Sequence, residues 1–502
     1  MIQFLLNNTP VTVENSRPTI TLLDWLRKDR GLVGTKEGCA SGDCGACTLL
    51  VGEQVAHGSS EKQWRYKTIN SCLMLLGNAH GKHIVTVEAV TQNLYADVDE
   101  LHPVQKAMVE SHGSQCGFCT PGIIMSLLAL YINNASYPGK KAVIHALGGN
   151  LCRCTGYQPI LKAAEKAFEY ERQPVAWAAT ADSFARSLRN AGNSLKEIPS
   201  LRFEQNHFYV PQSLKQLVNL KNQCPEARLI AGGTDLSIEF TQQLTEPAII
   251  ISVTQVTELI QVSDSGDGLV IGAAATYADF IELFCRHYPE SKELFERLGS
   301  EQIRNGGTLG GSLGNASPIG DPAPLLIALD ATLELVSIAG TRHVKVEDFF
   351  TGYRQTVLTA NEVIRQVLIP KRPASLKLAS HKISKRFEDD ISTVCLVLAV
   401  DHADDQITAV RCAMGGMAAL PARAKTVEQQ LLGASLSQHS FNQAASALAQ
   451  DFSPMSDVRA SAEYRLTVSQ NLLTRIGYEF CQPIDVVNVA EQPAVRIAHA
   501  SL

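Results

Sequence analysis

Four cysteines near the N-terminus have a spacing that suits them to hold a metal cluster. Cys39, Cys44 and Cys47 follow the pattern C-x4-C-x2-C, and Cys72 supplies a distant fourth thiol. This is the plant-ferredoxin arrangement, in which four thiolates hold the two irons of a [2Fe–2S] cluster. The loop also contains three glycines that let it bend around an inorganic core: Gly38, Gly42 and Gly45. The alternatives are a disulfide pair or a structural zinc, but zinc usually takes paired cysteine knuckles, which this loop lacks.

A second set of four cysteines forms the pattern C-x2-C … C-x-C. Its members are Cys116, Cys119, Cys152 and Cys154. Each pair precedes a predicted helix, one with Thr120 as N-cap and Pro121 as first residue, the other spanning 160–170. The partial positive charge at helix N-termini favours thiolates and an anionic cluster. The spacing alone also fits zinc, whereas a C-x-C disulfide would be strained. The ferredoxin-type loop upstream favours a second iron–sulfur cluster.

Composition excludes several classes of protein. The 502 residues correspond to about three domains, and a content of 45% hydrophobic and 19% charged residues is typical of a globular protein. A net charge of −6 without a basic run argues against a nucleic-acid partner. Residues 1–7 show no export signal, and the longest apolar run, 122–132, is too short to span a bilayer. We therefore expect a cytoplasmic protein without a membrane partner, whose cysteines stay reduced.

The order of predicted strands and helices divides the chain into domains. Short strands at 2–6, 11–13, 48–51 and 82–87, with a helix beginning near Thr21, indicate a small α+β module. The expected segments are that module at 1–87, a helical domain at 88–170, a linker at 171–200, a domain with two glycine-rich loops at 201–372, a small α+β domain at 375–490 and a tail at 491–502. The last domain contains a charged turn at 384–391.

The two glycine-rich loops could each approach a phosphate closely. The first follows a predicted strand at 228–231 and continues to Leu236, and the second runs from Gly306 to Pro318. Backbone N–H groups and hydroxyls in such loops can surround a pyrophosphate. Neither loop matches a Rossmann or P-loop fingerprint, and the first could equally be a surface turn. The second has five glycines in nine residues interleaved with leucines, which indicates close backbone packing.

With these motifs in place, the sequence resembles the molybdenum hydroxylase family, and within it the small subunits of bacterial xanthine dehydrogenases, along nearly its whole length. The motifs that carry the resemblance are residues 37–47, 115–122, 149–157, 229–236, 307–321 and 386–391. The resemblance implies an α+β multidomain fold with four parts: a ferredoxin-like β-grasp, a helical [2Fe–2S]-binding bundle, a vanillyl-alcohol-oxidase-type FAD-binding domain and a C-terminal α+β flavoprotein domain.

The resemblance also assigns roles to individual residues. The residues that would wrap the pyrophosphate of FAD are Leu229, Ile230, Ala231, Gly232, Gly233, Thr234, Asp235 and Leu236. Further FAD contacts are expected from Thr308, Ser312, Asp321, Ile364 and Lys382. Asp389 would lie on the nicotinamide side of the flavin, and Tyr353 matches a position associated with NAD binding. Two positions differ from the animal relatives, since Leu298 replaces an aromatic residue and Phe387 a basic one.

The resemblance finally implies a partner and an electron path. A large molybdenum-binding subunit would oxidise xanthine or hypoxanthine within an α2β2 heterotetramer. Electrons would pass from its molybdenum cofactor to the cluster at Cys116, then to the cluster at Cys39, to FAD and on to NAD+. No acid–base catalytic residue is expected on this chain. Three alternatives stay open: a stand-alone NAD(P)H-dependent iron–sulfur flavoprotein reductase, a zinc-and-thiol interaction module, and the same subunit of an aldehyde or N-heterocycle hydroxylase.

Overall fold

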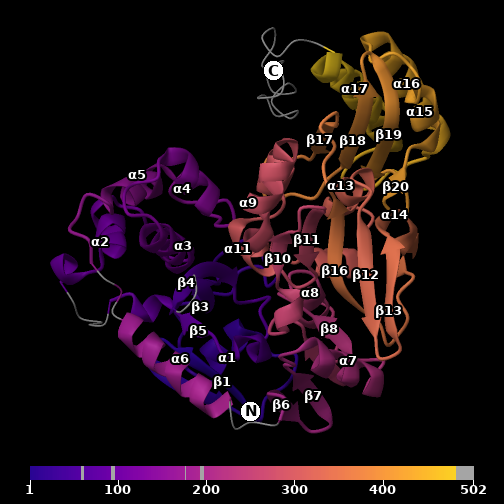
Figure 1. Cartoon of the computed structure of the whole chain (residues 1–502). Coiled ribbons are helices and arrows are strands. Elements are labelled where there is room, and N and C mark those ends of the chain that lie inside the picture. Colours follow the sequence, from indigo (N-terminus) through magenta and orange to yellow (C-terminus); the bar gives the residue numbers. More distant parts are fainter. Residues whose placement is uncertain (58–60, 92–96, 174, 176, 193–196, 482–502) are drawn as a thin grey trace. The chain divides into compact units, whose positions relative to one another are not determined.

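The computed structural model describes residues 1–57, 61–91, 97–173, 175, 177–192 and 197–481 (Figure 1). Two compact units make up the fold. The first consists of Met1–Thr257 and Ser300–Gly307, and the second of Glu258–Gly299 and the chain from Thr308 onward. Both units contain sheets and helices, so the expected α+β multidomain class is confirmed. The predicted domain limits stay predictions, and the tail 491–502 lies outside the described residues.

The N-terminal part of the first unit is a five-stranded sheet in the order β2-β1-β5-β3-β4. Its strands are β1 (Ile2–Leu6), β2 (Thr9–Val13), β3 (Thr48–His57), β4 (Glu61–Asn70) and β5 (His83–Val85). β1 and β5 are parallel and the other pairs are antiparallel. The predicted helix near Thr21 is α1 (Leu22–Lys28), and the Thr21 hydroxyl caps it by accepting the Asp24 N–H at 3.1 Å.

Four helices follow, and α3 is the central one of the group. They are α2 (Pro103–Glu110), α3 (Thr120–Asn133), α4 (Lys140–Ala146) and α5 (Gln158–Lys166). The sequence of α3 is apolar on nearly all sides, which is typical of a helix that other elements of the fold surround. Its residues Ile123, Leu127 and Leu128 are buried. The prediction of Thr120 as N-cap was wrong by one residue. Cys119 occupies the cap position, and the Thr120 hydroxyl pairs instead with the Ser114 hydroxyl at 2.7 Å.

The predicted linker at 171–200 contains a helix, α6 (Ala178–Gly192). Its buried residues Ala181, Phe184 and Ala185 recur at the i, i+3, i+4 spacing of a helix face. Ala181 and Phe184 pack on Leu5 of β1, and Figure 1 shows the helix alongside that strand. Small alanines carry most of this face, so its periodicity is weak in the sequence, and the prediction of a linker did not include this helix.

Three buried histidines in the first unit are held in their neutral form. The ring of His80 accepts the Gln3 N–H at 3.1 Å, and the ring of His102 accepts the Val104 N–H at 3.3 Å. His83 lies between the Tyr66 hydroxyl at 2.9 Å and the carbonyl oxygen of Asn7 at 2.7 Å. Burial lowers the pKa of each of the three imidazoles to about 4.

These histidines predict an acid-sensitive stability. Their pKa is about 4 in the folded chain and 6.5 when unfolded, so between these values only the unfolded chain binds the protons. Each buried histidine should then lower the unfolding free energy by about 1.4 kcal/mol for every pH unit between pH 6.5 and pH 4. Above pH 6.5 the three histidines should not change the unfolding free energy. Urea unfolding at several pH values measures this slope. Replacing His102 with phenylalanine should lower the slope by one histidine's share, whereas the same change at exposed His439 should leave it unchanged; equal slopes in all three proteins would contradict the assignment.

The rest of the first unit is a second, smaller sheet with three helices. The strand order is β6-β7-β9-β8, and the strands are β6 (Ser200–Phe203), β7 (Asn206–Tyr209), β8 (Arg228–Ile230) and β9 (Ile249–Ser252). The helices are α7 (Leu214–Gln223), α8 (Leu236–Thr241) and α11 (Glu301–Gly306). β8 is the buried strand predicted before the first glycine-rich loop, so the loop connects β8 to α8.

The second unit contains two larger sheets and two cores, and the core of the first sheet also includes residues of the second sheet, such as Leu378 and Val397. The first has the order β10-β11-β16-β12-β13, with β10 (Val262–Asp264), β11 (Gly268–Gly272), β12 (Thr332–Ser337), β13 (Gly340–Lys345) and β16 (Val363–Pro370). Its helices are α9 (Tyr277–His287), α10 (Lys292–Glu296), α12 (Leu309–Asn315), α13 (Pro322–Ala328) and α14 (Val346–Phe349), and a short hairpin is formed by β14 (Phe350–Gly352) and β15 (Gln355–Thr356).

The second sheet of this unit has the order β17-β18-β19-β20. Its strands are β17 (Lys377–Ile383), β18 (Val394–Ala403), β19 (Gln406–Gly415) and β20 (Ala422–Arg423), and its helices are α15 (Lys425–Leu431), α16 (Gln438–Asp451) and α17 (Ala462–Cys481). Strands and helices alternate in this part of the chain, as expected of the small α+β domain predicted here. Among the described residues of both units, no helix has the length and apolar character needed to cross a membrane.

Candidate functional site

The first cysteine loop curls around the sulfur of Cys39. The backbone N–H groups of Ser41 and Cys44 both donate to Sγ of Cys39 from 3.4 Å. Left-handed backbone at Gly42 (φ 85°) and Gly45 (φ 67°) makes this curl possible. N–H groups aimed at a thiolate stabilise its negative charge, which is how a protein tunes an iron–sulfur cluster.

The four thiols of the first set form two pairs. Sγ of Cys47 and Sγ of Cys72 are 3.3 Å apart, and the Cys39 thiol is hydrogen-bonded to that of Cys44. A [2Fe–2S] cluster takes two thiolates on each of two irons, whereas zinc needs four ligands around one point. The two pairs therefore fit the binuclear cluster.

Within each pair one thiol ionises easily and the other does not. The hydrogen bond with Cys44 lowers the pKa of Cys39 to about 4, and the same bond raises the pKa of Cys44. In the buried pair, the bond with Cys72 lowers the pKa of Cys47, and that bond raises the pKa of Cys72. Iron ligands must be deprotonated, and the lowered pKa of one thiol in each pair favours that form.

The second set of cysteines is also arranged as two pairs, but it is more exposed. Cys116 is hydrogen-bonded to Cys154, and Cys119 to Cys152. Cys116 and Cys154 are exposed, and Cys119 and Cys152 are half-buried. The predicted eight ligands thus come together as two groups of four, each with the same pairwise arrangement.

Neighbouring groups support the thiolates of the second set. The backbone N–H of Phe118 lowers the pKa of Cys116. Burial raises the pKa of Cys152, but the Thr155 hydroxyl, 3.1 Å from its sulfur, helps to bring the pKa below its usual value. The backbone N–H of Cys152 donates to the Tyr157 hydroxyl at 2.8 Å, which fixes the loop just ahead of α5.

The first glycine-rich loop, between β8 and α8, has a fixed backbone and two positions without room for a side chain. A Cβ at Gly232 would lie 2.0 Å from the carbonyl oxygen of Gly306. Gly233 has φ 76°, and a Cβ there would lie 2.3 Å from the Ser237 hydroxyl. The Asn78 amide holds the loop by donating to the carbonyl oxygen of Ala231 at 2.8 Å. Such a bare, immobilised backbone fits the close approach that a pyrophosphate requires.

Helix α8 connects this loop to the first cysteine set. The Ser237 hydroxyl donates to the carbonyl oxygen of Leu73 at 2.6 Å, next to Cys72. At the other end of the helix, the Thr241 hydroxyl donates to the carbonyl oxygen of Ala40 at 2.9 Å, next to Cys39. The loop predicted to bind FAD is therefore held directly against the segments that carry the first four cysteines.

From Thr308 onward, the second glycine-rich loop lies in the second unit and forms the helix α12. The Thr308 hydroxyl caps this helix by accepting the Gly311 N–H at 3.0 Å. Ser312 is hydrogen-bonded to the buried Tyr277 side chain. A Cβ at Gly310 would lie 2.5 Å from Cβ of Ala273, so the close backbone packing expected here is confirmed.

The glycines of α12 allow a matched test of this packing. Changing Gly310 to alanine should cost about 1–3 kcal/mol of unfolding free energy, because the new methyl group overlaps Ala273. Changing Gly314 to alanine should instead stabilise the helix by up to about 1 kcal/mol, since its nearest neighbour would be Cδ1 of Ile364 at 3.9 Å. Urea denaturation of both variants measures the two effects, and shifts of the same sign would show that α12 is not packed as described.

The structure brings two predicted FAD residues together as a buried ion pair. Nζ of Lys382 lies 2.6 Å from Oδ2 of Asp321, and their side chains are only 3% and 5% exposed. The Ser392 hydroxyl donates to the other carboxylate oxygen of Asp321. Ser392 was not among the predicted residues; its link to Asp321 spans 71 residues, and no local pattern marks it.

A fully buried arginine that the sequence did not single out holds the charged turn at 384–391. Arg297 donates to the carbonyl oxygens of Lys382 at 2.8 Å and Phe387 at 3.0 Å, and to the Ser384 hydroxyl at 2.9 Å. Its guanidinium also lies 4.9 Å from the centre of the Phe387 ring, a cation–π contact. Arg297 therefore fixes the turn in which Asp389 adopts a left-handed backbone (φ 49°).

The remaining predicted residues are Ile364, Tyr353 and Asp389, and they lie on different segments of the second unit. Ile364 is buried on β16 in the core of the first sheet of its unit. Tyr353 is 64% exposed in the turn between β14 and β15. The roles of Ile364, Tyr353 and Asp389 towards FAD or NAD stay predictions.

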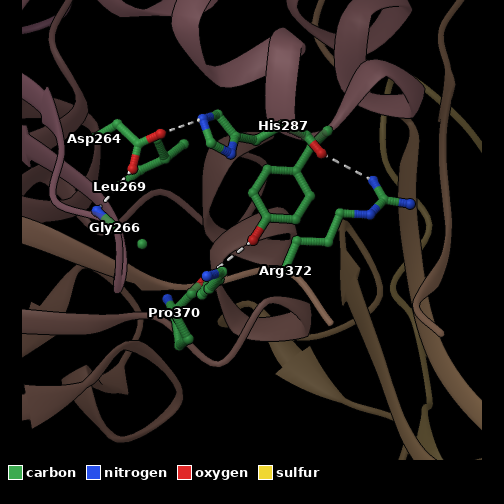
Figure 2. Close-up of a pocket in the computed structure, with 9 residues that line it drawn as sticks. Asp264, Gly266, Leu269, His287, Pro370 and Arg372 are labelled. Atoms are coloured by element: carbon green, nitrogen blue, oxygen red, sulfur yellow. Dashed lines mark hydrogen bonds and ion pairs between the residues drawn. The ribbon is translucent and has the colours of Figure 1, made fainter. Parts of the chain in front are cut away.

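A cavity of about 230 Å³ lies elsewhere in the second unit (Figure 2). Its polar side chains pair with protein groups: Asp264 with His287 at 3.0 Å, the Tyr288 hydroxyl with the carbonyl oxygen of Pro370 at 3.0 Å, and Arg372 with the carbonyl oxygen of His287 at 3.1 Å. None of the nine lining residues is a predicted site residue. We assign it no ligand.

Models of four protein families match successive parts of the chain. They describe a 2Fe-2S iron–sulfur cluster binding domain at 4–77, a [2Fe-2S] binding domain at 86–165, an FAD binding domain in molybdopterin dehydrogenase at 201–372, and a CO dehydrogenase flavoprotein C-terminal domain at 379–480. Both cysteine sets fall in [2Fe–2S] domains and both glycine-rich loops in the FAD domain. The domains present are therefore those that hold two [2Fe–2S] clusters and FAD.

Curated relatives resemble the chain along most of its length. Xanthine dehydrogenase of Drosophila pseudoobscura pseudoobscura is 32% identical over 498 residues, which cover 89% of this chain and 36% of that protein. Xanthine dehydrogenase of Emericella nidulans is 31% identical over 96% of this chain and 39% of the relative, and xanthine dehydrogenase/oxidase of Gallus gallus is 31% identical over 93% and 39%. The chain thus spans less than two fifths of the length of these relatives.

Solved structures of enzymes also resemble the chain. Carbon monoxide dehydrogenase of Hydrogenophaga pseudoflava has a TM-score of 0.52 and 27% identity, covering 56% of this chain and 96% of that one. Quinoline 2-oxidoreductase of Pseudomonas putida 86 has a TM-score of 0.51 and 26% identity, covering 57% of this chain and 98% of that one.

The chain belongs to the molybdenum hydroxylase family and carries the iron–sulfur and FAD domains of that family. Its neighbours act on different substrates, so the family alone does not identify the substrate.

Proposed function

We propose that this chain is the electron-transfer subunit of a xanthine dehydrogenase that uses NAD+ as oxidant. The observation that carries the proposal is the combination, in one chain, of two cysteine quartets arranged as thiol pairs and an FAD domain whose helix α8 is hydrogen-bonded to Leu73, next to Cys72. The curated relatives that cover most of the chain support xanthine as the substrate of the whole enzyme. Oxidation of the purine would occur on a large molybdenum-binding partner, in an α2β2 assembly.

Residues of this chain would position the cofactors rather than transfer protons to a substrate. The four cysteines Cys39, Cys44, Cys47 and Cys72 would hold one cluster, and Cys116, Cys119, Cys152 and Cys154 the other. Leu229–Leu236 in the first unit, and Thr308, Ser312, Asp321 and Lys382 in the second, would hold FAD. When bound, the clusters would carry single electrons and the flavin would exchange one or two, so that a flavin reduced by two electrons could donate a hydride to NAD+.

The test is an anaerobic NADH titration of the purified chain, followed by absorbance, with iron, zinc and flavin assayed on the same sample. About four irons and one FAD per chain, with the flavin and iron–sulfur bands bleaching together, would support the proposal. Zinc without flavin would overturn it. Flavin and iron that NADH does not reduce would retain the electron-transfer role and reject NAD+ as the oxidant.

A second candidate is the same subunit of a hydroxylase for another N-heterocycle, which the similarity to quinoline 2-oxidoreductase favours. The two candidates differ in the partner, so the substrate turned over by the assembled enzyme decides between them. A stand-alone reductase would instead show NADH oxidation with a soluble acceptor and no bound large subunit.

A further inference from the structure

The two cysteine loops are joined directly through their backbones. The N–H of Leu151 donates to the carbonyl oxygen of Cys44 at 3.0 Å, which links the residue before Cys152 to the first set. A Cβ at Gly45 would lie 2.1 Å from the carbonyl oxygen of Gly149. The two loops therefore touch at Gly45 and Gly149, where neither loop has a side chain to separate the backbones.

The buried side chain of Asn150 lies at the centre of this contact. Its Nδ2 donates to the carbonyl oxygen of Gly45 at 3.1 Å and to the Thr48 hydroxyl at 3.3 Å. Its Oδ1 accepts from the Ser126 hydroxyl at 2.7 Å and from Nε2 of Gln302 at 3.0 Å. Two donors and two acceptor sites are the full capacity of a primary amide, so Asn150 is completely satisfied.

Gln302 reaches Asn150 from a distant part of the sequence. It lies on α11, 152 residues beyond Asn150, and its side chain is 1% exposed. Its Nε2 also lies 3.3 Å from the Thr48 and Ser126 hydroxyls. Four segments of the chain therefore meet in one buried polar network between the two cysteine loops: residues 45–48, Ser126, Asn150 and Gln302.

The contacts of Asn150 fall beside predicted iron ligands. Gly45 follows Cys44, Thr48 follows Cys47, and Asn150 itself stands two residues before Cys152. The Asn150 amide makes all four of its hydrogen bonds, whereas Oε1 of Gln302 is buried without a hydrogen-bond partner among the described residues. Removing Asn150 would leave several further buried groups without partners and loosen the contact between the backbones that it joins. A change at position 150 would thus shift the cysteines of one set relative to those of the other.

We infer that Asn150 is a positioning residue that sets the separation of the two clusters, and that Gln302 holds the Asn150 amide in the required orientation. This inference rests on the proposed function only in that both clusters must be present. Because the magnetic coupling of two paramagnetic centres falls steeply with distance, the coupling between the reduced clusters reports their separation.

The test is electron paramagnetic resonance of the chemically reduced full chain, with iron assayed on the same samples. In Asn150→Leu the splitting due to cluster–cluster coupling should change or disappear while about four irons per chain are retained. The matched control is Asn305→Leu on α11. Asn305 is a buried amide that donates to the carbonyl oxygen of Thr68 at 2.9 Å, so this variant should lose comparable stability without a change in the coupling.

Gln302→Leu provides a second measurement if Asn150→Leu does not fold, and it should alter the coupling in the same direction. Wild-type coupling in a folded, iron-loaded Asn150→Leu or Gln302→Leu chain would overturn the inference and leave the proposed function intact. The same change of coupling in Asn305→Leu would also overturn it, because the effect would then be general loosening. Wild-type protein without iron would overturn the proposed function and this inference together.

Discussion

Replacement of Cys72 by alanine is expected to halve the iron content of the purified chain, from about four atoms to about two. Cys72 lies 3.3 Å from Cys47, and both are buried in one small core with Leu23 and Leu73. An iron on this pair would lose one of its two thiolates, and no water could replace the ligand easily in so apolar a position. Iron analysis and visible circular dichroism measure the loss.

Two further variants make this result specific. Cys116→Ala should also leave about two irons, but the remaining spectrum should be that of the other cluster, since Cys116 belongs to the exposed set. Cys224→Ala, at the end of α7, should retain about four irons because Cys224 is not part of either quartet. Full iron content in Cys72→Ala, or loss of all iron in it, would contradict two independent clusters held by these cysteines.

Breaking the buried ion pair of Asp321 and Lys382 should have the largest effect on stability. In Lys382→Met, the carboxylate of Asp321 stays buried without its positive partner, which typically costs about 3–5 kcal/mol. In the double variant Asp321→Asn with Lys382→Met, no charge is left buried, and the amide oxygen of the new asparagine can still accept from Ser392. The double variant should therefore recover much of the lost free energy of unfolding.

Urea unfolding of the wild type, both single variants and the double variant completes the thermodynamic cycle. The coupling between the two positions should reach about 1–3 kcal/mol. Lys345→Met is the control, since Lys345 pairs with Asp330 at 2.9 Å but both side chains are about two fifths exposed. That change should cost at most about 1 kcal/mol. Additive effects at 321 and 382 would show that the two charges do not depend on each other.

The features that could be predicted from sequence are those whose determinants are close together in the chain. The helix that begins near Thr21, the strands β1 and β2, and the C-x4-C-x2-C loop follow from spacings of a few residues. Cluster ligands are well suited to such prediction, because three thiols in one loop must bind the same inorganic core. The FAD residues came instead from family resemblance, since their loops match no short fingerprint.

The features that could not be predicted depend on distant partners or on weak local patterns. α6 has an apolar face made mainly of alanine, which differs little from a polar linker in hydrophobicity. Arg297 gives no local signal because its backbone acceptors lie 85 and 90 residues away. Asn150 was visible as part of a motif, but its role depends on Gln302, and nothing in either local sequence indicates that the two side chains meet.

The short segment Ser300–Gly307 belongs by its contacts to the first unit, while the residues on both sides of it belong to the second. The polypeptide therefore passes from one unit to the other at three places, after Thr257, Gly299 and Gly307. A protein shortened to Met1–Thr257 would lack α11 and expose the buried partners of Gln302 and Asn305. The two units are thus not interchangeable modules: a gene split at that point would leave the iron–sulfur part without α11 and would divide the two glycine-rich loops predicted to bind FAD between the two products.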